Sequence, residues 1–97
     1  MTTPVTIPEG WTLTPEGLKK NLTFKDFTEA VAYVVLIGKK AEAANHHPDI
    51  DIRWNKVNLV LITHSKGKVT EADYEMAGEL NSVSEADAKA LAPSILK

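Results

Sequence analysis

The chain has no cysteine among its 97 residues. This absence excludes disulfides, thiolate nucleophiles, iron–sulfur clusters and cysteine-based zinc sites. A domain of this size without such cross-links must depend on its core, and that fits a reducing compartment. The first ten residues, MTTPVTIPEG, also have neither the basic nor the apolar region of a secretory signal. We therefore expect a cytoplasmic protein.

Long apolar runs and an excess of positive charge are missing as well. The longest apolar run, AVAYVVLIG at 30–38, is far shorter than the span of about 20 residues that crosses a bilayer. Eleven basic and thirteen acidic residues give a net charge of -2, and acids are interleaved with the lysines. A nucleic-acid binder usually has a clustered basic face. The sequence thus predicts one soluble domain over residues 1–97, with neither a membrane nor a nucleic acid as partner.

Alternating polar and apolar residues predict four strands. Two strand-like pieces, 11–14 and 18–24, flank the sequence PEG, which favours a tight hairpin turn. Alternation over 50–54, ending at a tryptophan, and over 57–64 predicts a second hairpin. Asn55–Lys56 is the expected turn between them.

Two helices have clear start signals. Asp26 is a cap for a helix over 26–45, and Pro48 disfavours helical backbone just before it, so this helix should end by the histidine pair. Its expected apolar stripe is Phe27, Ala30, Val31, Val34, Val35, Gly38 and Ala41. Thr70 with Asp73 predicts a second helix over 71–81.

The tail should hold one more short helix. Ser84 is its expected cap, the helix covers 85–91, and Pro93 is expected to stop it. Residues 1–10 are expected to form an extended arm, and 82–97 a C-terminal tail. The order strand, strand, helix, strand, strand, helix indicates an α+β two-layer sandwich, a four-stranded antiparallel sheet with helices packed on one face.

Three histidines are the candidates for chemistry. His46 and His47 follow the end of the first helix, and His64 ends the last strand. Glu42 lies four residues before His46, so its carboxylate can reach that imidazole. If the helix crosses the sheet, the three rings converge on one shallow cleft. Imidazoles suit proton transfer near neutral pH.

Two other interpretations remain open on these residues alone. A three-histidine zinc centre that uses His64 is one, although neighbouring histidines rarely bind the same ion and the H-E-x-x-H spacing is absent. The other is structural, because a histidine pair at a helix end also interacts favourably with the helix dipole. The pattern does not decide between catalysis and this structural role.

Longer motifs resemble a known family. EAANHHP, then WNKVNLVLITH, then GKVTEAD, together with GW at 10–11 and FKDF at 24–27, resemble the pterin-4a-carbinolamine dehydratases over residues 10–81. The resemblance implies a four-stranded antiparallel sheet with helices on one side. It also implies dehydration of 4a-hydroxytetrahydropterin, the by-product of aromatic amino-acid hydroxylases, to quinonoid dihydropterin, as in tetrahydrobiopterin recycling.

The resemblance further implies partners and their limits. The pterin is the substrate, no metal or organic cofactor takes part, and members form homodimers or homotetramers. Some members are coactivator partners of a transcription factor. A pterin-binding or protein-interaction module of the same fold, without catalysis, is therefore the alternative to the enzyme.

By the family's motif, His46 and His64 match the acid/base histidines, and His47 the one that binds and orients the pterin. Glu42 matches an acid that anchors the pterin or polarises a histidine. The resemblance also implies that four further residues contact the substrate: Pro48, Thr63, Ser65 and Lys66.

Four more positions have two interpretations or depart from the pattern. Asp73 matches a family acid, yet a purely structural role as a helix cap is favoured. Trp11 matches a tryptophan near the site, and burial in the core is an equal alternative. Trp54 is expected in the core or an interface. Lys68 stands where the family commonly has glycine, which puts the shape of the loop after His64 in doubt.

Overall fold

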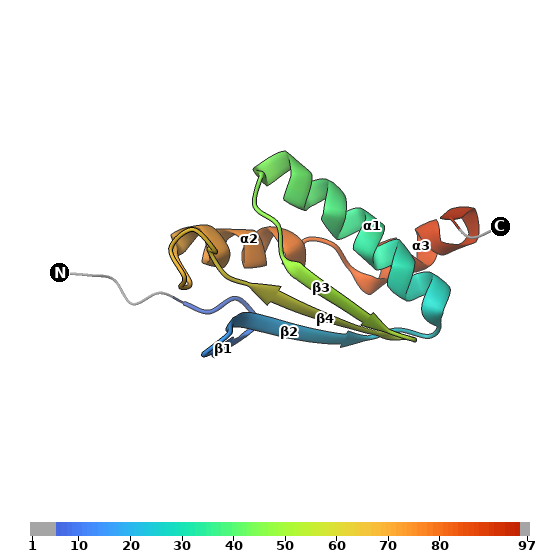
Figure 1. Cartoon of the computed structure of the whole chain (residues 1–97). Helices are drawn as coiled ribbons and strands as arrows, with labels where there is room; N and C mark the ends of the chain where they lie inside the picture. Colours follow the sequence, from blue (N-terminus) through green and yellow to red (C-terminus); the bar gives the residue numbers. More distant parts are fainter. Residues whose placement is uncertain (1–5, 96–97) are drawn as a thin grey trace.

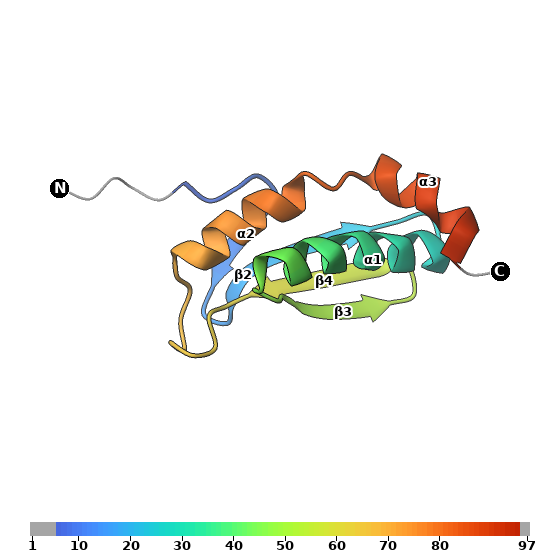
Figure 2. The ribbon, with the colours of Figure 1, turned by 90° about the horizontal axis from the view of Figure 1, so that it is seen from above.

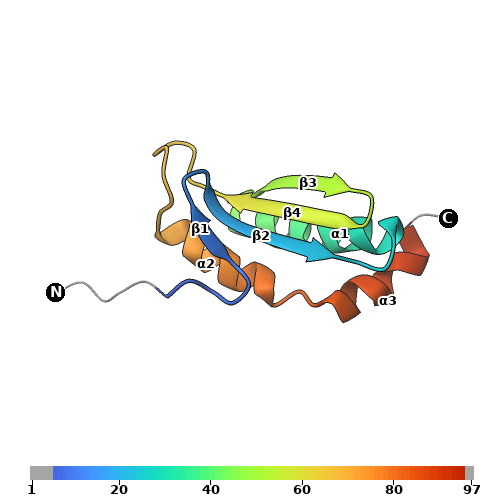
Figure 3. The ribbon, with the colours of Figure 1, turned by 90° about the horizontal axis from the view of Figure 1, so that it is seen from below.

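The structure, a computed structural model that describes residues 6–95, has a four-stranded antiparallel sheet with three helices on one face (Figure 1). The elements follow in the order β1 (Thr12–Thr14), β2 (Gly17–Thr23), α1 (Phe27–Ala44), β3 (Asp49–Arg53), β4 (Lys56–Leu61), α2 (Glu71–Asn81) and α3 (Glu85–Ile95). Figure 3, seen from below, shows the sheet in front and the helices behind it. The predicted α+β two-layer fold is confirmed.

The sheet has the strand order β1-β2-β4-β3, so the two hairpins meet along β2 and β4. In that central pairing Leu18 lies opposite Leu61, and Leu22 opposite Val57. Because side chains alternate across a strand, this register directs the apolar residues of both strands toward the helices. The face turned away from the helices, called the outer face below, is consequently polar.

The first hairpin turns at Pro15–Glu16, inside the predicted PEG turn. Gly17 follows with φ +137°, and a Cβ there would lie 2.5 Å from the Leu61 carbonyl oxygen. Only glycine fits a backbone with positive φ so close to a neighbouring strand. The turn sequence thus also allows β2 to approach β4.

The second hairpin differs from its prediction. It turns at Trp54–Asn55, one residue early, because Asn55 is fixed by two hydrogen bonds with Phe24: the Asn55 side-chain amide donates to the Phe24 carbonyl, and the Phe24 N–H donates to the Asn55 carbonyl. Trp54 adopts a left-handed φ of 55° and is 69% exposed, so it does not lie in the core, and its alternative place in an interface stays a prediction.

Helix α1 begins and ends as predicted, but its buried face is partly different. The Asp26 side chain accepts a hydrogen bond from the Glu29 N–H, and Asn45 ends the helix in the left-handed conformation. The buried residues are Ala30, Ala32, Tyr33, Ile37 and Ala41, whereas Phe27 and Val35 are exposed. The segment is apolar nearly all round, so periodicity alone cannot select the face that meets the sheet.

The C-terminal helix is longer than predicted. The Ser84 hydroxyl accepts from the Asp87 N–H, and the Asp87 carboxylate accepts from the Ser84 N–H, which confirms the expected cap. Pro93 lies inside α3 and does not stop it before Ile95. A proline in the last turn removes only one helical hydrogen bond, to the exposed residue Lys89. Burial of Ala88 and Ala92 against the rest of the core compensates for that loss.

Figure 2 shows α1 and α2 over the sheet and α3 along the N-terminal half of α1. The C-terminal end of α1 and the N-terminal end of α2 therefore lie at the same end of the molecule, away from α3. Residues 6–10 form no helix or strand, and the Trp11 N–H donates to the Pro8 carbonyl; the rest of the predicted arm lies outside the described residues. None of the described helices has the length and apolarity required to cross a membrane.

Candidate active site

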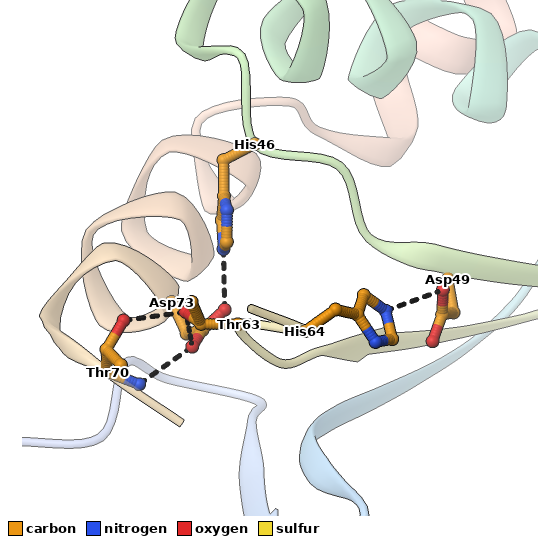
Figure 4. A network of polar contacts seen from close by, with 6 residues as sticks. All are labelled: His46, Asp49, Thr63, His64, Thr70 and Asp73. Carbon is orange, nitrogen blue, oxygen red and sulfur yellow. Dashed lines mark hydrogen bonds and ion pairs between the residues drawn. The ribbon is translucent and has the colours of Figure 1, made fainter. Parts of the chain in front are cut away.

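A buried carboxylate binds the first histidine at the shared end of α1 and α2. Nε2 of His46 lies 2.6 Å from Oδ1 of Asp73 (Figure 4). The Asp73 side chain is completely buried, whereas that of His46 is 21% exposed. A buried carboxylate must be matched by donors, so it fixes the imidazole with Nε2–H toward itself. The other ring nitrogen, Nδ1, is then the one left for chemistry.

The second oxygen of Asp73 is held from two sides. Oδ2 accepts a hydrogen bond from the Thr63 hydroxyl at 2.8 Å and from the Thr70 backbone N–H at 2.8 Å. Because the Thr63 hydroxyl proton is used on Asp73, the Thr70 hydroxyl must be the donor in its 2.7 Å contact with Thr63. These contacts join the end of β4, the start of α2 and His46 into one network.

Asp73 makes contacts that bear on both interpretations. Its contact with the Thr70 N–H is the expected capping interaction at the start of α2, which confirms the structural role. Its contact with His46 is the kind of carboxylate–imidazole pair found at catalytic sites. A part of Asp73 in catalysis stays a prediction. Thr70, taken only as a cap, is an additional member of this network.

The second histidine has a different partner from the one expected for the pair. Glu42 contacts His47, with Oε2 2.9 Å from Nε2, and not His46. The i,i+4 geometry that predicted the contact with His46 holds only inside a helix. Asn45 leaves the helix with φ 51° and ψ 41°, so the two histidines diverge after it. Both side chains of the Glu42–His47 pair are more than half exposed.

The third histidine is paired with an acid that the sequence had not indicated. Nε2 of His64 lies 3.5 Å from Oδ1 of Asp49, the first residue of β3 (Figure 4). Asp49 lies opposite Val60 in the antiparallel β3–β4 ladder. The chain just before Asp49 and the chain just after Val60 therefore run side by side toward the site. The two side chains are 70% and 62% exposed. Only this cross-strand register could have revealed Asp49, because it is far from His64 in the sequence.

The three histidines are thus arranged as three separate imidazole–carboxylate pairs. His46 points toward Thr63 and Asp73, whereas His64 points away from them toward Asp49 (Figure 4). A groove of ≈ 750 Å³ between α1 and α2 has His46 at its end. The other residues that line it come from the two helices: Lys40, Ala43, Ala44, Ala72, Glu75, Met76, Gly78 and Glu79. His47 and His64 do not line this groove, and the convergence of the three rings on one cleft stays a prediction.

The residues predicted to contact the substrate differ in whether they are accessible to a ligand. The Thr63 hydroxyl is used inside the Asp73 network, and the Thr63 backbone is used by its own loop, which leaves it no evident free group for a ligand. Ser65 and Lys66 are exposed in that loop, and Pro48 is half-buried. The loop's left-handed residue is Gly67, with φ 65°, so Lys68 causes no strain there.

Trp11 lies at the other end of α2. It is 6% exposed, and its ring N–H donates to the Asn81 side chain at 3.0 Å. Lys20 donates to the same oxygen at 2.7 Å, and burial lowers the pKa of the Lys20 ammonium, an effect that the nearby acid Glu9 opposes. Thr70 and Asn81 are at opposite ends of this helix, so the structure gives Trp11 a role in packing and none in contact with the histidines.

Within residues 6–95, no cluster of three or more histidines and acids has a geometry that could hold a metal ion. The arrangement offers instead three imidazoles, each with a carboxylate beside one ring nitrogen. Such a pair can accept a proton on the free nitrogen and stabilise the resulting imidazolium, or donate that proton again. The site is therefore suited to general acid/base chemistry.

Comparison with known proteins agrees with this chemistry. The sequence model of the family described as pterin 4 alpha carbinolamine dehydratase matches residues 2–83. A relative from Mycobacterium sp. (strain KMS), named as a pterin-4-alpha-carbinolamine dehydratase, is 42% identical over 79 residues, 79% of this chain and 84% of its own. One of the same name from Roseiflexus sp. (strain RS-1) is 43% identical over 76% of this chain and 80% of its own.

Solved structures agree with the fold. The crystal structure of a transcriptional coactivator/pterin dehydratase from Brucella Melitensis has a TM-score of 0.70 and 34% identity over 76% of this chain and 81% of its own. A pterin dehydratase-like protein identified as a RuBisCO assembly factor in the alpha-carboxysome has a TM-score of 0.58 over 80% of this chain and 86% of its own. At 22% identity this second likeness concerns the fold alone. On the extent of these matches, the chain belongs to the pterin 4 alpha carbinolamine dehydratase family.

Proposed function

We propose that this protein dehydrates 4a-hydroxytetrahydropterin to quinonoid dihydropterin and water, as part of tetrahydrobiopterin recycling. The observation that supports this most directly is the imidazole of His46, held by the buried carboxylate of Asp73 in a chain of this family. The reaction needs no electron transfer. It needs one proton delivered to the 4a-hydroxyl and one removed from N5, and imidazoles do both near neutral pH.

His46 and His64 have surroundings suited to different steps. His46, with Nε2 on Asp73, takes the N5 proton on its free Nδ1, and Asp73 stabilises the imidazolium that forms. His64 is 70% exposed and can regain its proton from solvent, so it gives that proton to the 4a-hydroxyl. The C4a–O bond breaks, water leaves, and the N5 electron pair forms the new double bond to C4a. His47, beside Glu42, orients the pterin.

The loop after His64 is the proposed edge of the pterin site. The exposed residues Ser65 and Lys66 can meet the ring's donors and acceptors there, with Pro48 on the other side. We assign no substrate contact to the side chain of Thr63, because its hydroxyl is bonded to Asp73.

The test is the decay of the 4a-carbinolamine, followed by its absorbance, with wild type and with His46→Ala and His64→Ala. Loss of general acid/base catalysis typically costs 10²–10⁴-fold in rate, so we expect each variant to be about 100-fold slower or worse. His47→Ala is the matched variant from the same histidine pair, and we expect it to lose about tenfold or less. Folded wild-type protein that leaves the decay rate unchanged would refute the proposal.

A second candidate is a protein-interaction module, and the exposed apolar side chains favour it. Phe27 and Val35 on α1, Ile50 on β3 and Trp54 at the β3–β4 turn are all at least 38% exposed. The Brucella Melitensis protein of the same fold is named as a transcriptional coactivator as well as a pterin dehydratase. A folded protein that binds a pterin without accelerating the decay would favour this candidate over the enzyme.

The same residues support a homo-oligomer, a dimer or a tetramer. β3 is an edge strand with one free side, and an unpaired edge beside apolar side chains is a common place for a second copy to add. The chain's lack of cysteine fits the reducing cytoplasm as the place where it works. Sedimentation at micromolar concentration tests the oligomer, and a monomer there would refute it.

A further inference from the structure

Asp49 is not part of any motif that identified the site, yet it is the acid nearest to His64. We infer that Asp49 is a positioning residue, which holds the His64 ring with Nε2 beside its carboxylate and so directs Nδ1 toward the substrate. The inference rests on the proposed function for its effect on rate. Its effect on the imidazole can be measured without any reaction.

The position of Asp49 follows from the fold. Pro48 fixes the backbone just before it, and the β3–β4 ladder places Asp49 opposite Val60. β4 ends at Leu61, and the chain continues to His64 beside the start of β3. The Asp49 carboxylate therefore reaches the imidazole from a neighbouring strand, with Oδ1 3.5 Å from Nε2. No loop rearrangement is needed to form the pair.

The chemical consequence concerns the proposed general acid. A general acid must present the nitrogen that carries the proton to the leaving hydroxyl, so the orientation of its ring matters. With Nε2 beside the Asp49 carboxylate, Nδ1 is the nitrogen that faces away and can meet the 4a-hydroxyl. Asp49 thus selects which ring nitrogen of His64 is free for the reaction.

The size of the effect is limited by exposure. Exposed ion pairs contribute about 0.2–1 kcal/mol, and the upper end of that range corresponds to about a fivefold change in rate. They are also weakened by salt, because the Debye length falls to about 3 Å at 1 M. A large, salt-independent effect would be inconsistent with this geometry.

Asp51 provides the control within the same strand. It lies two residues along, on the same outer face, and both acids line one shallow hollow of the sheet. Its carboxylate is 3.0 Å from Nε of Arg53 and accepts a hydrogen bond from Asn58, so it has partners of its own. Asp51→Asn therefore changes the net charge of this face as much as Asp49→Asn does, but it leaves the contact between Asp49 and His64 intact.

The first experiment compares Asp49→Asn, Asp49→Glu and Asp51→Asn in the carbinolamine assay at low ionic strength. We expect Asp49→Asn to be about fivefold slower, Asp49→Glu to recover most of the rate, and Asp51→Asn to stay within about twofold of wild type. In 1 M NaCl the difference between Asp49→Asn and wild type should shrink. Equal rates for Asp49→Asn and Asp51→Asn at low salt would overturn the inference.

The second experiment needs no substrate and separates this inference from the proposed function. The nitrogen chemical shifts of the His64 ring are measured by NMR at one fixed pH, because they report which ring nitrogen is held by a partner. In Asp49→Asn the Nε2 signal should move, whereas in Asp51→Asn it should not. An unchanged Nε2 signal in Asp49→Asn overturns the role of Asp49 even if the enzyme is active. A moved Nε2 signal with inactive wild type supports that role and refutes the dehydratase.

Discussion

His46–Asp73 and His64–Asp49 have the same chemical groups but very different surroundings. In the first pair the carboxylate is fully buried and the contact is 2.6 Å; in the second both side chains are more than 60% exposed and the contact is 3.5 Å. The buried carboxylate is also bonded to Thr63 and Thr70, whereas the exposed one has no second hydrogen-bond or ion-pair partner among the described residues. A pair with a buried carboxylate is tied to the fold, and an exposed pair can adjust and exchange protons with water.

This difference separates two requirements of a general acid/base site. The base must be held in one orientation, and a buried, fully bonded carboxylate does that at a cost in desolvation that its hydrogen bonds offset. The acid must be reprotonated between turnovers, and exposure allows that. The comparison therefore predicts that changes in the buried pair affect both folding and rate, whereas changes in the exposed pairs affect rate alone.

The largest expected effect comes from Asp73→Ala. The substitution leaves the Thr63 hydroxyl, the Thr70 N–H and His46 without their acceptor, and each buried donor left unpaired costs about 1–3 kcal/mol. We expect the free energy of unfolding to fall by about 3–5 kcal/mol in total and the rate by about 100-fold or more. Urea denaturation and the carbinolamine assay measure the two effects.

Asp87→Ala is the matched control for Asp73→Ala. Asp87 has the same capping position in α3, but it is exposed, and among the described residues its hydrogen bonds go only to Ser84. Loss of this exposed cap should lower the free energy of unfolding much less than loss of Asp73 does, and the rate should not change. A similar loss of stability in both variants would mean that burial of Asp73 does not increase its contribution to the free energy of unfolding.

The next largest effect should come from Thr63→Val, which removes one hydroxyl at nearly constant shape. Asp73 keeps the Thr70 N–H and His46, but the Thr70 hydroxyl loses its acceptor. We expect a loss of about 1–2 kcal/mol in unfolding free energy and a moderate loss of rate. Thr23→Val, an exposed threonine of β2, should change neither. If Thr63→Val is as stable as wild type, the hydroxyl chain does not support the buried pair.

Tyr33 is the counterpart of Asp73, because its buried hydroxyl has no hydrogen-bond partner among the described residues. Tyr33→Phe should therefore leave the unfolding free energy at neutral pH unchanged or raise it by up to about 1 kcal/mol. Burial, with a smaller contribution from Glu85, raises the pKa of Tyr33 to about 12. The unfolded phenol ionises near its usual value, so this contribution to stability is complete below about pH 10 and is lost as the pH rises to 12.

The pH dependence can be measured by urea denaturation of wild type and Tyr33→Phe at pH 7 and at pH 11. Wild type should lose more stability than the variant between these two values. An equal loss in both proteins would show that the phenol ionises as easily in the folded state as in the unfolded one.

The smallest expected effect is that of Glu42→Gln. The pair with His47 is exposed, and an amide can still accept a hydrogen bond from the ring. We expect less than about 0.5 kcal/mol in stability and about a twofold change in rate, both reduced further by salt. A tenfold loss that persists in 1 M NaCl would show that this exposed pair is held as firmly as the buried one.

Much of the fold could be predicted from the sequence because its signals are local. The caps Asp26, Thr70 and Ser84 each mark the start of a helix that the structure contains, and the PEG turn lies at the first hairpin. Capping and turn chemistry depend on residues within four positions of one another, so they do not require knowledge of the tertiary structure.

Two differences from the predictions concern residues whose surroundings come from distant parts of the chain, and two others have local causes. Trp54 is exposed because Asn55 is fixed by Phe24, and Pro93 is tolerated because α3 is packed against the core. Glu42 was matched with His46 by a helical spacing that ends at Asn45. The apolar face of α1 was only partly identified, since the helix is apolar on several sides.

The candidate site was predictable to a similar extent. All three histidines were identified from the sequence, and family membership, now shown by comparison, was recognised from the motifs that contain them. Their partners were not identified correctly, because Asp73 and Asp49 reach His46 and His64 through the β3–β4 register and the position of α2. Sequence spacing thus indicates which groups are candidates for the chemistry, whereas the register of the sheet decides which groups they contact.

The most direct test of the account is the rate of 4a-carbinolamine decay with wild type, His46→Ala, His64→Ala and His47→Ala, each confirmed as folded by circular dichroism. The account predicts strong acceleration by wild type, a loss of about 100-fold or more for His46→Ala and His64→Ala, and a loss of about tenfold or less for His47→Ala. A folded His46→Ala that keeps the wild-type rate would contradict it, because the buried pair with Asp73 would then have no part in the reaction.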